Sequence, residues 1–196
     1  VGDINGDGFA DMLVETRVFG RYANHETGYV VFGRASGFDA TLDSSDLDGS
    51  NGFHLTAGEP SQLFQNPSMA FDVAGDINDD GFDDLIIGAV APSVEANDTG
   101  AAYVVFGKAS GFAHTVDVFD SNNKDVVRMN GEAIGDSAGS SVSGAGDVNG
   151  DGFDDMLVGA PGANSSYLIF GSREFGGGQL PVIPGTPDDD VLRGTS

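Results

Sequence analysis

The sequence of 196 residues contains no cysteine, and it has only 8 basic side chains against 31 acidic ones. The lack of cysteine excludes disulfides and thiolate metal sites, and it leaves the redox compartment open. The resulting net charge of −23 repels nucleic acid and anionic membranes and attracts cations. No stretch approaches 18 consecutive apolar residues, the length that a membrane-spanning helix needs. We therefore expect no nucleic acid partner and no membrane insertion.

Recognisable catalytic motifs are also missing. His25, His54 and His114 lie in unrelated sequence contexts, and His25-Glu26 does not extend to the zinc-protease pattern H-E-x-x-H. Lys108 lacks the upstream glycine spacing of a phosphate-binding loop, and no G-x-S-x-G nucleophile motif occurs. The sequence thus predicts a protein that is not an enzyme, with no catalytic residues and with its histidines at the surface.

What the sequence does contain is one nine-residue pattern, D-x-N-x-D-G-F-x-D, in three copies. The copies begin at Asp3, Asp76 and Asp147, so their starts are 73 and 71 residues apart. Oxygen-bearing side chains stand at positions 1, 3, 5 and 9, and position 6 is a glycine that permits the positive φ of a sharp turn. Ca²⁺ takes six to eight oxygen ligands at about 2.3–2.6 Å, which such a loop can supply. A metal-free Asx-turn is the alternative, but three identical copies favour calcium.

We expect each loop to hold one Ca²⁺, which makes three sites. The predicted coordination is three carboxylates, one amide, the main-chain carbonyl of the phenylalanine at position 7, and water. The predicted ligands are Asp3, Asn5, Asp7, Phe9 and Asp11; Asp76, Asn78, Asp80, Phe82 and Asp84; and Asp147, Asn149, Asp151, Phe153 and Asp155. Side chains alternate in direction along a strand, so position 8 (Ala10, Asp83, Asp154) should face away from the metal.

The residues after each loop predict strands. Position 12 is Val14, Ile87 or Val158, whereas an EF-hand has a glutamate there and continues as a helix. Short apolar runs follow each loop, and further runs of this kind recur in each repeat. The predicted strands lie within 11–14, 28–33, 52–58, 70–75, 84–88, 102–107, 126–131, 141–146, 155–159 and 166–171. They predict an all-β fold of four-stranded antiparallel sheets in series, which is the pattern of a β-propeller.

From about residue 1 to 171 the chain resembles the FG-GAP repeats of integrin α propellers and of their bacterial relatives. The similarity lies in the calcium loops, in Phe32-Gly33, Phe106-Gly107 and Phe170-Gly171, and in Gly159-Ala160-Pro161. The second and first repeats depart from Gly-Ala-Pro, with Gly88-Ala-Val90 and Glu15-Thr-Arg17. The resemblance implies that the loop joins the innermost strand of a blade to the next strand, and that the three residue sets above are ligands.

The predicted organisation is an incomplete propeller of about two to three blades. We expect a first repeat without its inner strand at 1–58, a second at 59–131, a partial third at 132–175 and a tail at 176–196. A closed propeller usually has four to eight blades. Flanking blades of a longer parent chain, or else self-association, would complete it, and we favour the former. The tail resembles the start of an RTX nonapeptide array at Asp190 and Leu192, with Asp188 in place of a glycine; a disordered acidic tail is the alternative.

These features predict a calcium-binding, extracellular module of a larger secreted or surface protein, with a structural or adhesive role. Its ligand would be a protein or a carbohydrate, presented to the loops of the face opposite the calcium sites. Calcium sites in extracellular modules often have affinities of only about 10⁻⁴–10⁻³ M, which suits that setting. The alternative is an accessory, carbohydrate-binding propeller of a secreted hydrolase, since such repeats also accompany catalytic domains.

Overall fold

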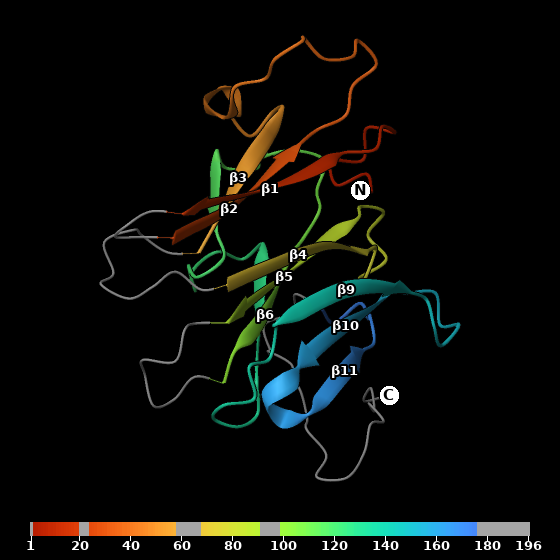
Figure 1. Cartoon of the computed structure of the whole chain (residues 1–196). Coiled ribbons are helices and arrows are strands. Elements are labelled where there is room, and N and C mark those ends of the chain that lie inside the picture. Colours follow the sequence, from red (N-terminus) through yellow and green to blue (C-terminus); the bar gives the residue numbers. More distant parts are fainter. Residues whose placement is uncertain (1, 20–23, 58–67, 91–98, 176–196) are drawn as a thin grey trace.

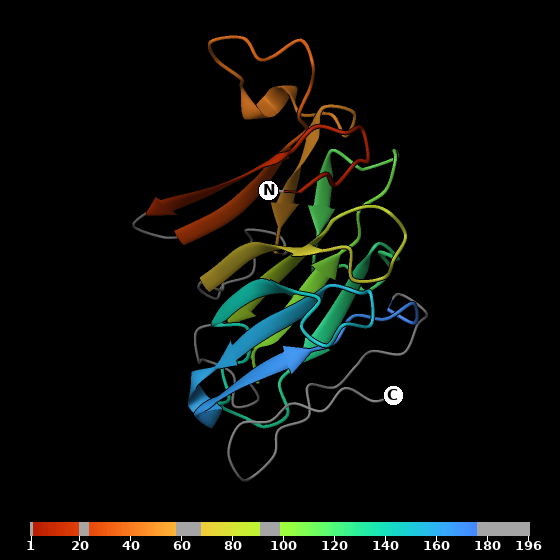
Figure 2. The same cartoon turned by 90° about the vertical axis from the view of Figure 1, so that its right-hand side faces the viewer.

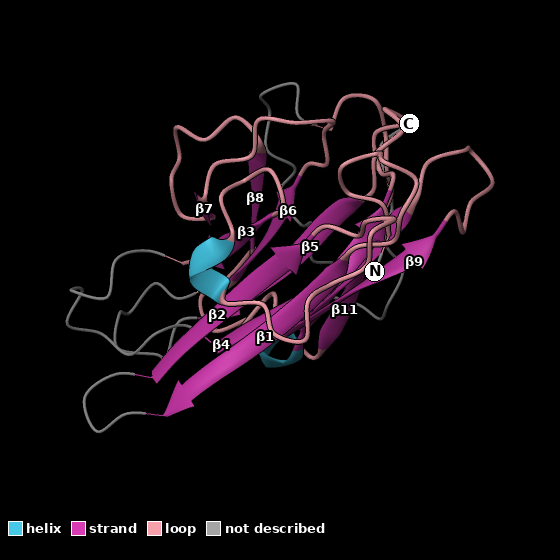
Figure 3. Cartoon of the chain, turned by 90° about the horizontal axis from the view of Figure 1, so that it is seen from above, coloured by secondary structure: helices cyan, strands magenta, loops and turns pink. Residues whose placement is uncertain are grey.

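A computed structural model describes residues 2–19, 24–57, 68–90 and 99–175. Within these ranges the fold is all-β, and the strands form three sheets that lie one beside the next (Figures 1 and 2). Regular structure other than strand is confined there to two single-turn 3-10 helices, η1 (Ser44–Asp46) and η2 (Pro161–Ala163) (Figure 3). The predicted fold class is confirmed. The RTX-like positions Asp188, Asp190 and Leu192 and the side chain of His25 lie outside the described residues.

The second sheet is the complete four-stranded unit, and all its strand pairs are antiparallel. Its strands, in spatial order, are β4 (Ser68–Gly75), β5 (Asp84–Val90), β6 (Ala101–Val105) and β8 (Val126–Asn130). The second loop joins the edge strand β4 to its neighbour β5, which is the connection that the resemblance implied. Apart from the short strand that lies in the connection between β6 and β8, strands that are consecutive in the sequence are neighbours in this sheet, which is the order of a β-meander.

The first sheet contains one strand that the sequence pattern did not predict. Its spatial order is β1 (Met12–Phe19), β2 (Asn24–Val31), β3 (Gly52–Thr56) and β7 (Thr115–Asp117). The short strand β7 belongs to the connection between β6 and β8 of the second sheet, yet it pairs with β3 in parallel. The second repeat thus extends a segment onto the outer edge of the first sheet.

The third sheet has three described strands. They are β9 (Ser141–Gly146), β10 (Asp155–Ala160) and β11 (Ser165–Ile169), in the order β11-β10-β9, and both pairs are antiparallel. The third loop joins β9 to β10, as the second loop joins β4 to β5. Register shifts occur at both places where these loops enter the sheets, beside Asp84 and beside Asp155, which is where bulges bend a strand.

Two hydrophobic cores separate the three sheets, and alternate residues of the second sheet supply both. Leu85 and Ile87 of β5 pack into the core toward the first sheet, whereas Ile86 packs into the core toward the third. All three are fully buried. A strand that is covered on both faces needs a continuous apolar run rather than an alternating one, which explains the sequence Leu-Ile-Ile.

An aromatic side chain from the second repeat also fills the core of the first sheet. Phe112 is 7% exposed and stacks on Phe53, with ring centroids 4.7 Å apart. The equivalent residue of the first repeat is Phe38, which is 43% exposed. The same sequence, Ala-Ser-Gly-Phe, therefore buries its ring only where a neighbouring sheet receives it.

We predict that Phe112→Ala lowers the free energy of unfolding by about 3–5 kcal/mol, because it leaves a cavity between two sheets. Phe38→Ala is the matched control, and it should cost less than about 1 kcal/mol because its ring is already half in solvent. Urea unfolding of both variants in the same calcium buffer measures the difference. Equal losses for the two substitutions would contradict the proposed packing.

Candidate metal centres

The three predicted calcium loops lie along one edge of the stack of sheets, at the right in Figure 1. The first loop, residues 3–11, precedes β1; the second, 76–84, joins β4 to β5; the third, 147–155, joins β9 to β10. Each loop is made mostly of Asp, Asn and Gly. Asp and Asn side chains bond to nearby backbone, and glycine has no side chain, so all three favour a tight turn over a continued strand. The repeat in sequence is therefore a repeat in space, with one loop per sheet.

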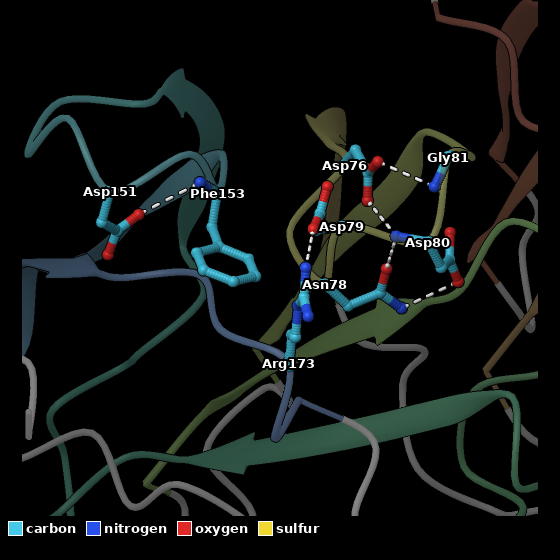
Figure 4. A network of polar contacts seen from close by, with 8 residues as sticks. All are labelled: Asp76, Asn78, Asp79, Asp80, Gly81, Asp151, Phe153 and Arg173. Atoms are coloured by element: carbon cyan, nitrogen blue, oxygen red, sulfur yellow. Dashed lines mark hydrogen bonds and ion pairs between the residues drawn. The ribbon is translucent and has the colours of Figure 1, made fainter.

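The aspartate at loop position 1 folds over the turn that follows it. In the second loop Asp76 accepts the N–H of Asp80 at 3.0 Å and that of Gly81 at 2.9 Å (Figure 4). Gly81 has a φ of +90°, which explains the glycine at position 6. The equivalent aspartates of the first and third loops, Asp3 and Asp147, accept the corresponding pairs of N–H groups.

Positions 3 and 5 face each other across the same turn. Asn78 accepts the N–H of Asp80 at 3.0 Å, and its Nδ2 donates to Asp80 Oδ2 at 2.9 Å (Figure 4). Asp80 Oδ1 in turn accepts the N–H of Phe82 at 3.0 Å. The first and third loops repeat these three bonds. In each loop the N–H of the phenylalanine at position 7 thus donates to the aspartate at position 5. The carbonyl of that phenylalanine stays a predicted ligand.

The aspartate at position 9 is buried and joins the loop to the Phe-Gly pair that follows β2, β6 or β11 of its own sheet. Asp84 is fully buried; it accepts the N–H of Ile77 at 3.2 Å and the N–H of Gly107 at 2.8 Å. The equivalent acceptors are Asp11 for Ile4 and Gly33, at 2.7 and 2.8 Å, and Asp155 for Val148 and Gly171, at 2.9 and 3.0 Å. Each carboxylate oxygen takes one of these bonds and keeps acceptor capacity for a metal.

Like charges act on this buried carboxylate. Burial raises the pKa of Asp84 to about 8, against the lowering effect of its two backbone hydrogen bonds, and the charges of Asp80 and Asp76 raise it further. The pKa of Asp11 is also raised, first by burial and also by Asp3 and Asp7. The carboxylates at positions 1, 5 and 9 therefore repel one another. A cation among them would relieve this repulsion.

The residues of the loops fit calcium by their chemistry. Each loop offers only oxygen donors, which suit a hard cation, and its turn already orients positions 1, 3 and 5. In the part of the chain that is described, no three His, Cys, Asp or Glu side chains converge closely enough to hold a metal as they stand. Hydrogen bonds from backbone N–H groups occupy the loop carboxylates instead. Calcium binding by the predicted residues therefore stays a proposal, based on the donor set and the shape of the turn.

The aspartate at position 8, which we predicted to face away from the metal, links neighbouring loops. Asp83 of the second loop accepts the N–H of Asp3 at 2.6 Å and donates its own N–H to the carbonyl of Asp3 at 3.1 Å. Asp154 of the third loop makes the same pair of bonds with Asp76, at 3.0 and 3.2 Å. The sequence pattern did not predict this role, because the partner lies in another repeat.

The glycine of each Phe-Gly pair lies where no larger residue fits. A Cβ on Gly107 would be 2.4 Å from the carbonyl oxygen of Asp83 and 2.9 Å from that of Ile4. Gly33 and Gly171 are equally close to the backbone of their own loops. Lys108, the next residue, donates its N–H to the carbonyl of Ile4 at 3.0 Å, and Ser172 does so to that of Ile77 at 2.8 Å. The Phe-Gly pair and the residue after it therefore contact both their own loop and the loop of the preceding repeat.

Two histidines that looked unrelated in the sequence lie side by side. The ring centroids of His54 and His114 are 4.5 Å apart, because β7 pairs with β3. His54 Nε2 lies 2.7 Å from the carbonyl oxygen of Ser44, and His114 Nδ1 contacts that of Leu47. Each contact requires the ring nitrogen to be the donor, so these nitrogens do not serve as bases. The pair connects two repeats.

These sheets and loops define a chain of β-propeller blades, each with an acidic loop at the same edge. Residues 138–179 match the family model of the FG-GAP repeat. Integrin alpha-7 of Rattus norvegicus is 30% identical over 162 residues, which cover 82% of this chain and 12% of the relative. Integrin alpha-E of Mus musculus is 31% identical over 175 residues, 87% of this chain and 13% of the relative.

The chain is therefore an FG-GAP, integrin-alpha-like chain of propeller blades, as its sequence pattern predicted. It spans only about an eighth of the length of these curated relatives. Integrin alpha-4 of Xenopus laevis, 27% identical over 170 residues, covers 85% of the chain. The similarity thus extends over all three sheets, whereas the FG-GAP model covers the third.

We predict that Gly107→Ala lowers the free energy of unfolding by about 1–3 kcal/mol or more, because the added methyl group meets backbone atoms of two loops. The φ of Gly107 lies outside the left-handed region, so the effect reports on space rather than on backbone strain. Ser110→Ala, at an exposed position of the same connection, is the control and should stay within about 0.5 kcal/mol. Equal stability of the two variants by urea unfolding would show that the Phe-Gly pair does not pack as described.

Proposed function

We propose that the chain is a non-enzymatic, calcium-binding module with three sites, one in each loop. The ligands are the side chains at positions 1, 3, 5 and 9 and the main-chain carbonyl at position 7. The observation that carries the proposal is the threefold recurrence of one acidic turn, in which the side-chain oxygens at positions 1, 3 and 5 accept N–H groups of the turn itself. Four side-chain oxygen groups and a carbonyl, with water, make up the six to eight ligands that Ca²⁺ takes.

In this proposal the bound ion supplies positive charge and cross-links the turn to the buried aspartate at position 9. Asp84 already joins the second loop to Gly107, which follows the third strand of its sheet, β6. An ion shared by Asp76, Asp80 and Asp84 therefore holds the loop against the start of β5 and against the residues that follow β6. Three such ions offset part of the net charge of −23 and reduce the self-repulsion of the folded chain.

We further propose an extracellular setting and an adhesive or ligand-binding role. Support comes from the integrin alpha names of the relatives and from the acidic loops, which suit the calcium concentrations found outside cells. Among the described residues, no helix has the length and apolar character to cross a bilayer. The ligand, a protein or a carbohydrate, would bind at the edge opposite the calcium loops, where β1, β5 and β10 end.

Calcium removal should destabilise the protein. Binding to the folded state alone contributes RT ln(1 + [L]/Kd), which is about 1.4 kcal/mol for each site at ten times Kd. We expect three sites to contribute about 4 kcal/mol, so the melting temperature in millimolar calcium should lie several degrees above that in excess EDTA. Calcium added back after EDTA should restore it, and magnesium at the same concentration serves as the ionic control. Superimposable melting curves would refute calcium binding.

A position-specific test uses two aspartates of the third loop. We predict that Asp151→Ala, at position 5, lowers the calcium stoichiometry from three to two. Asp154→Ala, at position 8, should leave it at three because its carboxylate is bonded to the backbone of Asp76 instead. Calorimetric titration of both variants, each checked for folding by circular dichroism, measures the stoichiometry. Loss of a site in Asp154→Ala with none in Asp151→Ala would overturn the assignment of ligands.

A further inference from the structure

The chain has three histidines, and two of them, His54 and His114, meet although the repeat pattern requires histidine at neither position. In the second sheet Arg128 takes the place of His54, because it pairs with a tyrosine of β6 as His54 pairs with a tyrosine of β2. In the first repeat Ala40 stands where the second has His114, two residues after the shared Gly-Phe. Two separate departures from the repeat thus lie side by side, with ring centroids 4.5 Å apart.

One short turn orients both imidazole rings. His54 Nε2 donates to the carbonyl of Ser44 at 2.7 Å, and His114 Nδ1 donates to the carbonyl of Leu47. Ser44 begins η1 and Leu47 is its C-cap residue, so the two carbonyls belong to the same turn. Tyr29 also packs edge to face against His54, with centroids 4.9 Å apart. Backbone and side-chain contacts therefore fix the direction of the rings.

These bonds leave one nitrogen of each ring with a lone pair. A neutral imidazole carries one N–H, so donation from His54 Nε2 and His114 Nδ1 leaves His54 Nδ1 and His114 Nε2 as acceptors. The donating nitrogens face the same turn, and the other nitrogen of each ring lies across the ring from it. The two lone pairs therefore lie on the side of the pair away from the turn. His54 is half-buried and His114 is exposed, so an ion from solution can reach this side.

This arrangement is the one in which histidine binds transition metals. A metal-bound histidine almost always donates its other ring N–H to a carbonyl or carboxylate, which fixes the tautomer and orients the ring. Both rings here already make such a bond to a backbone carbonyl. Zinc–nitrogen distances of about 2.0–2.1 Å place two nitrogens on one ion at most about 4.2 Å apart. Rings whose centroids are 4.5 Å apart are compatible with that spacing.

We propose that His54 Nδ1 and His114 Nε2 bind one divalent transition metal ion of the class of Zn²⁺ and Cu²⁺. Water completes the coordination, since no group of three His, Cys, Asp or Glu side chains forms a metal site among the described residues. The ion connects β3 of the first sheet to β7 of the second repeat, which share only three residue pairs. Imidazole suits these metals, whereas calcium takes oxygen ligands. The site is therefore independent of the acidic loops in both its residues and its ion.

Zinc titration of the full chain by calorimetry, at a constant millimolar calcium concentration, tests the site. We expect His54→Gln and His114→Gln each to bind one zinc ion fewer than the unmodified chain. The double variant should also bind one fewer rather than two, because both rings hold the same ion. His25→Gln, which changes the third histidine, is the matched control and should keep the unmodified stoichiometry. Zinc held by the acidic loops would appear equally in all these proteins, so the difference reports on the histidines alone.

Equal zinc stoichiometry in the unmodified chain and the single variants would refute the site, as would a loss in only one of them. A loss of two ions in the double variant would refute a shared ion. Circular dichroism without zinc checks that each variant is folded. A second measurement needs no variant: Cu²⁺ added at a low ratio to the unmodified chain should broaden the NMR ring signals of His54 and His114 together. Broadening of one ring alone, or of neither, would contradict the proposal.

Discussion

The structure depends on one buried carboxylate in each repeat, the aspartate at loop position 9. It accepts one backbone N–H from the start of its own loop and another from the glycine of the Phe-Gly pair, and in Asp84 and Asp155 it is fully buried. Burying a charge this way is unfavourable unless it is hydrogen-bonded or paired. The backbone supplies the hydrogen bonds, and calcium is the proposed counter-charge. Loop, strand and proposed metal site thus share the same side chain.

This constraint explains the glycine of the Phe-Gly pair and the contact that each repeat makes with the one before it. The glycine donates to the position-9 carboxylate, and it lies too close to the loop backbone for a Cβ. The residue after it then bonds to the preceding loop, as Lys108 does to Ile4. Each repeat therefore contacts its predecessor through its own loop and its Phe-Gly pair. Contacts between neighbours alone are the rule in repeat proteins.

The strands and the loops were predictable from the sequence because their signals are local. The apolar run after Asp84 determines the strand, and Gly81 determines the turn, each within a few residues. The position-8 contact was not predictable, because Asp83 meets Asp3 only after two sheets have packed together. The same holds for β7 and for the pairing of His54 with His114, which require a connection of the second repeat to reach the first sheet. Local patterns contain no information on which repeat supplies such a partner.

Amide hydrogen exchange, measured by NMR with calcium and with EDTA, tests the central role of the position-9 aspartate most directly. The relevant amides are the donors to these three carboxylates: Ile4, Gly33, Ile77, Gly107, Val148 and Gly171. We expect all six amides to be protected in calcium and to exchange faster when EDTA removes the ion. Exchange at the rate of exposed loop amides in calcium would contradict it, because these bonds would then not hold the loops to the sheets.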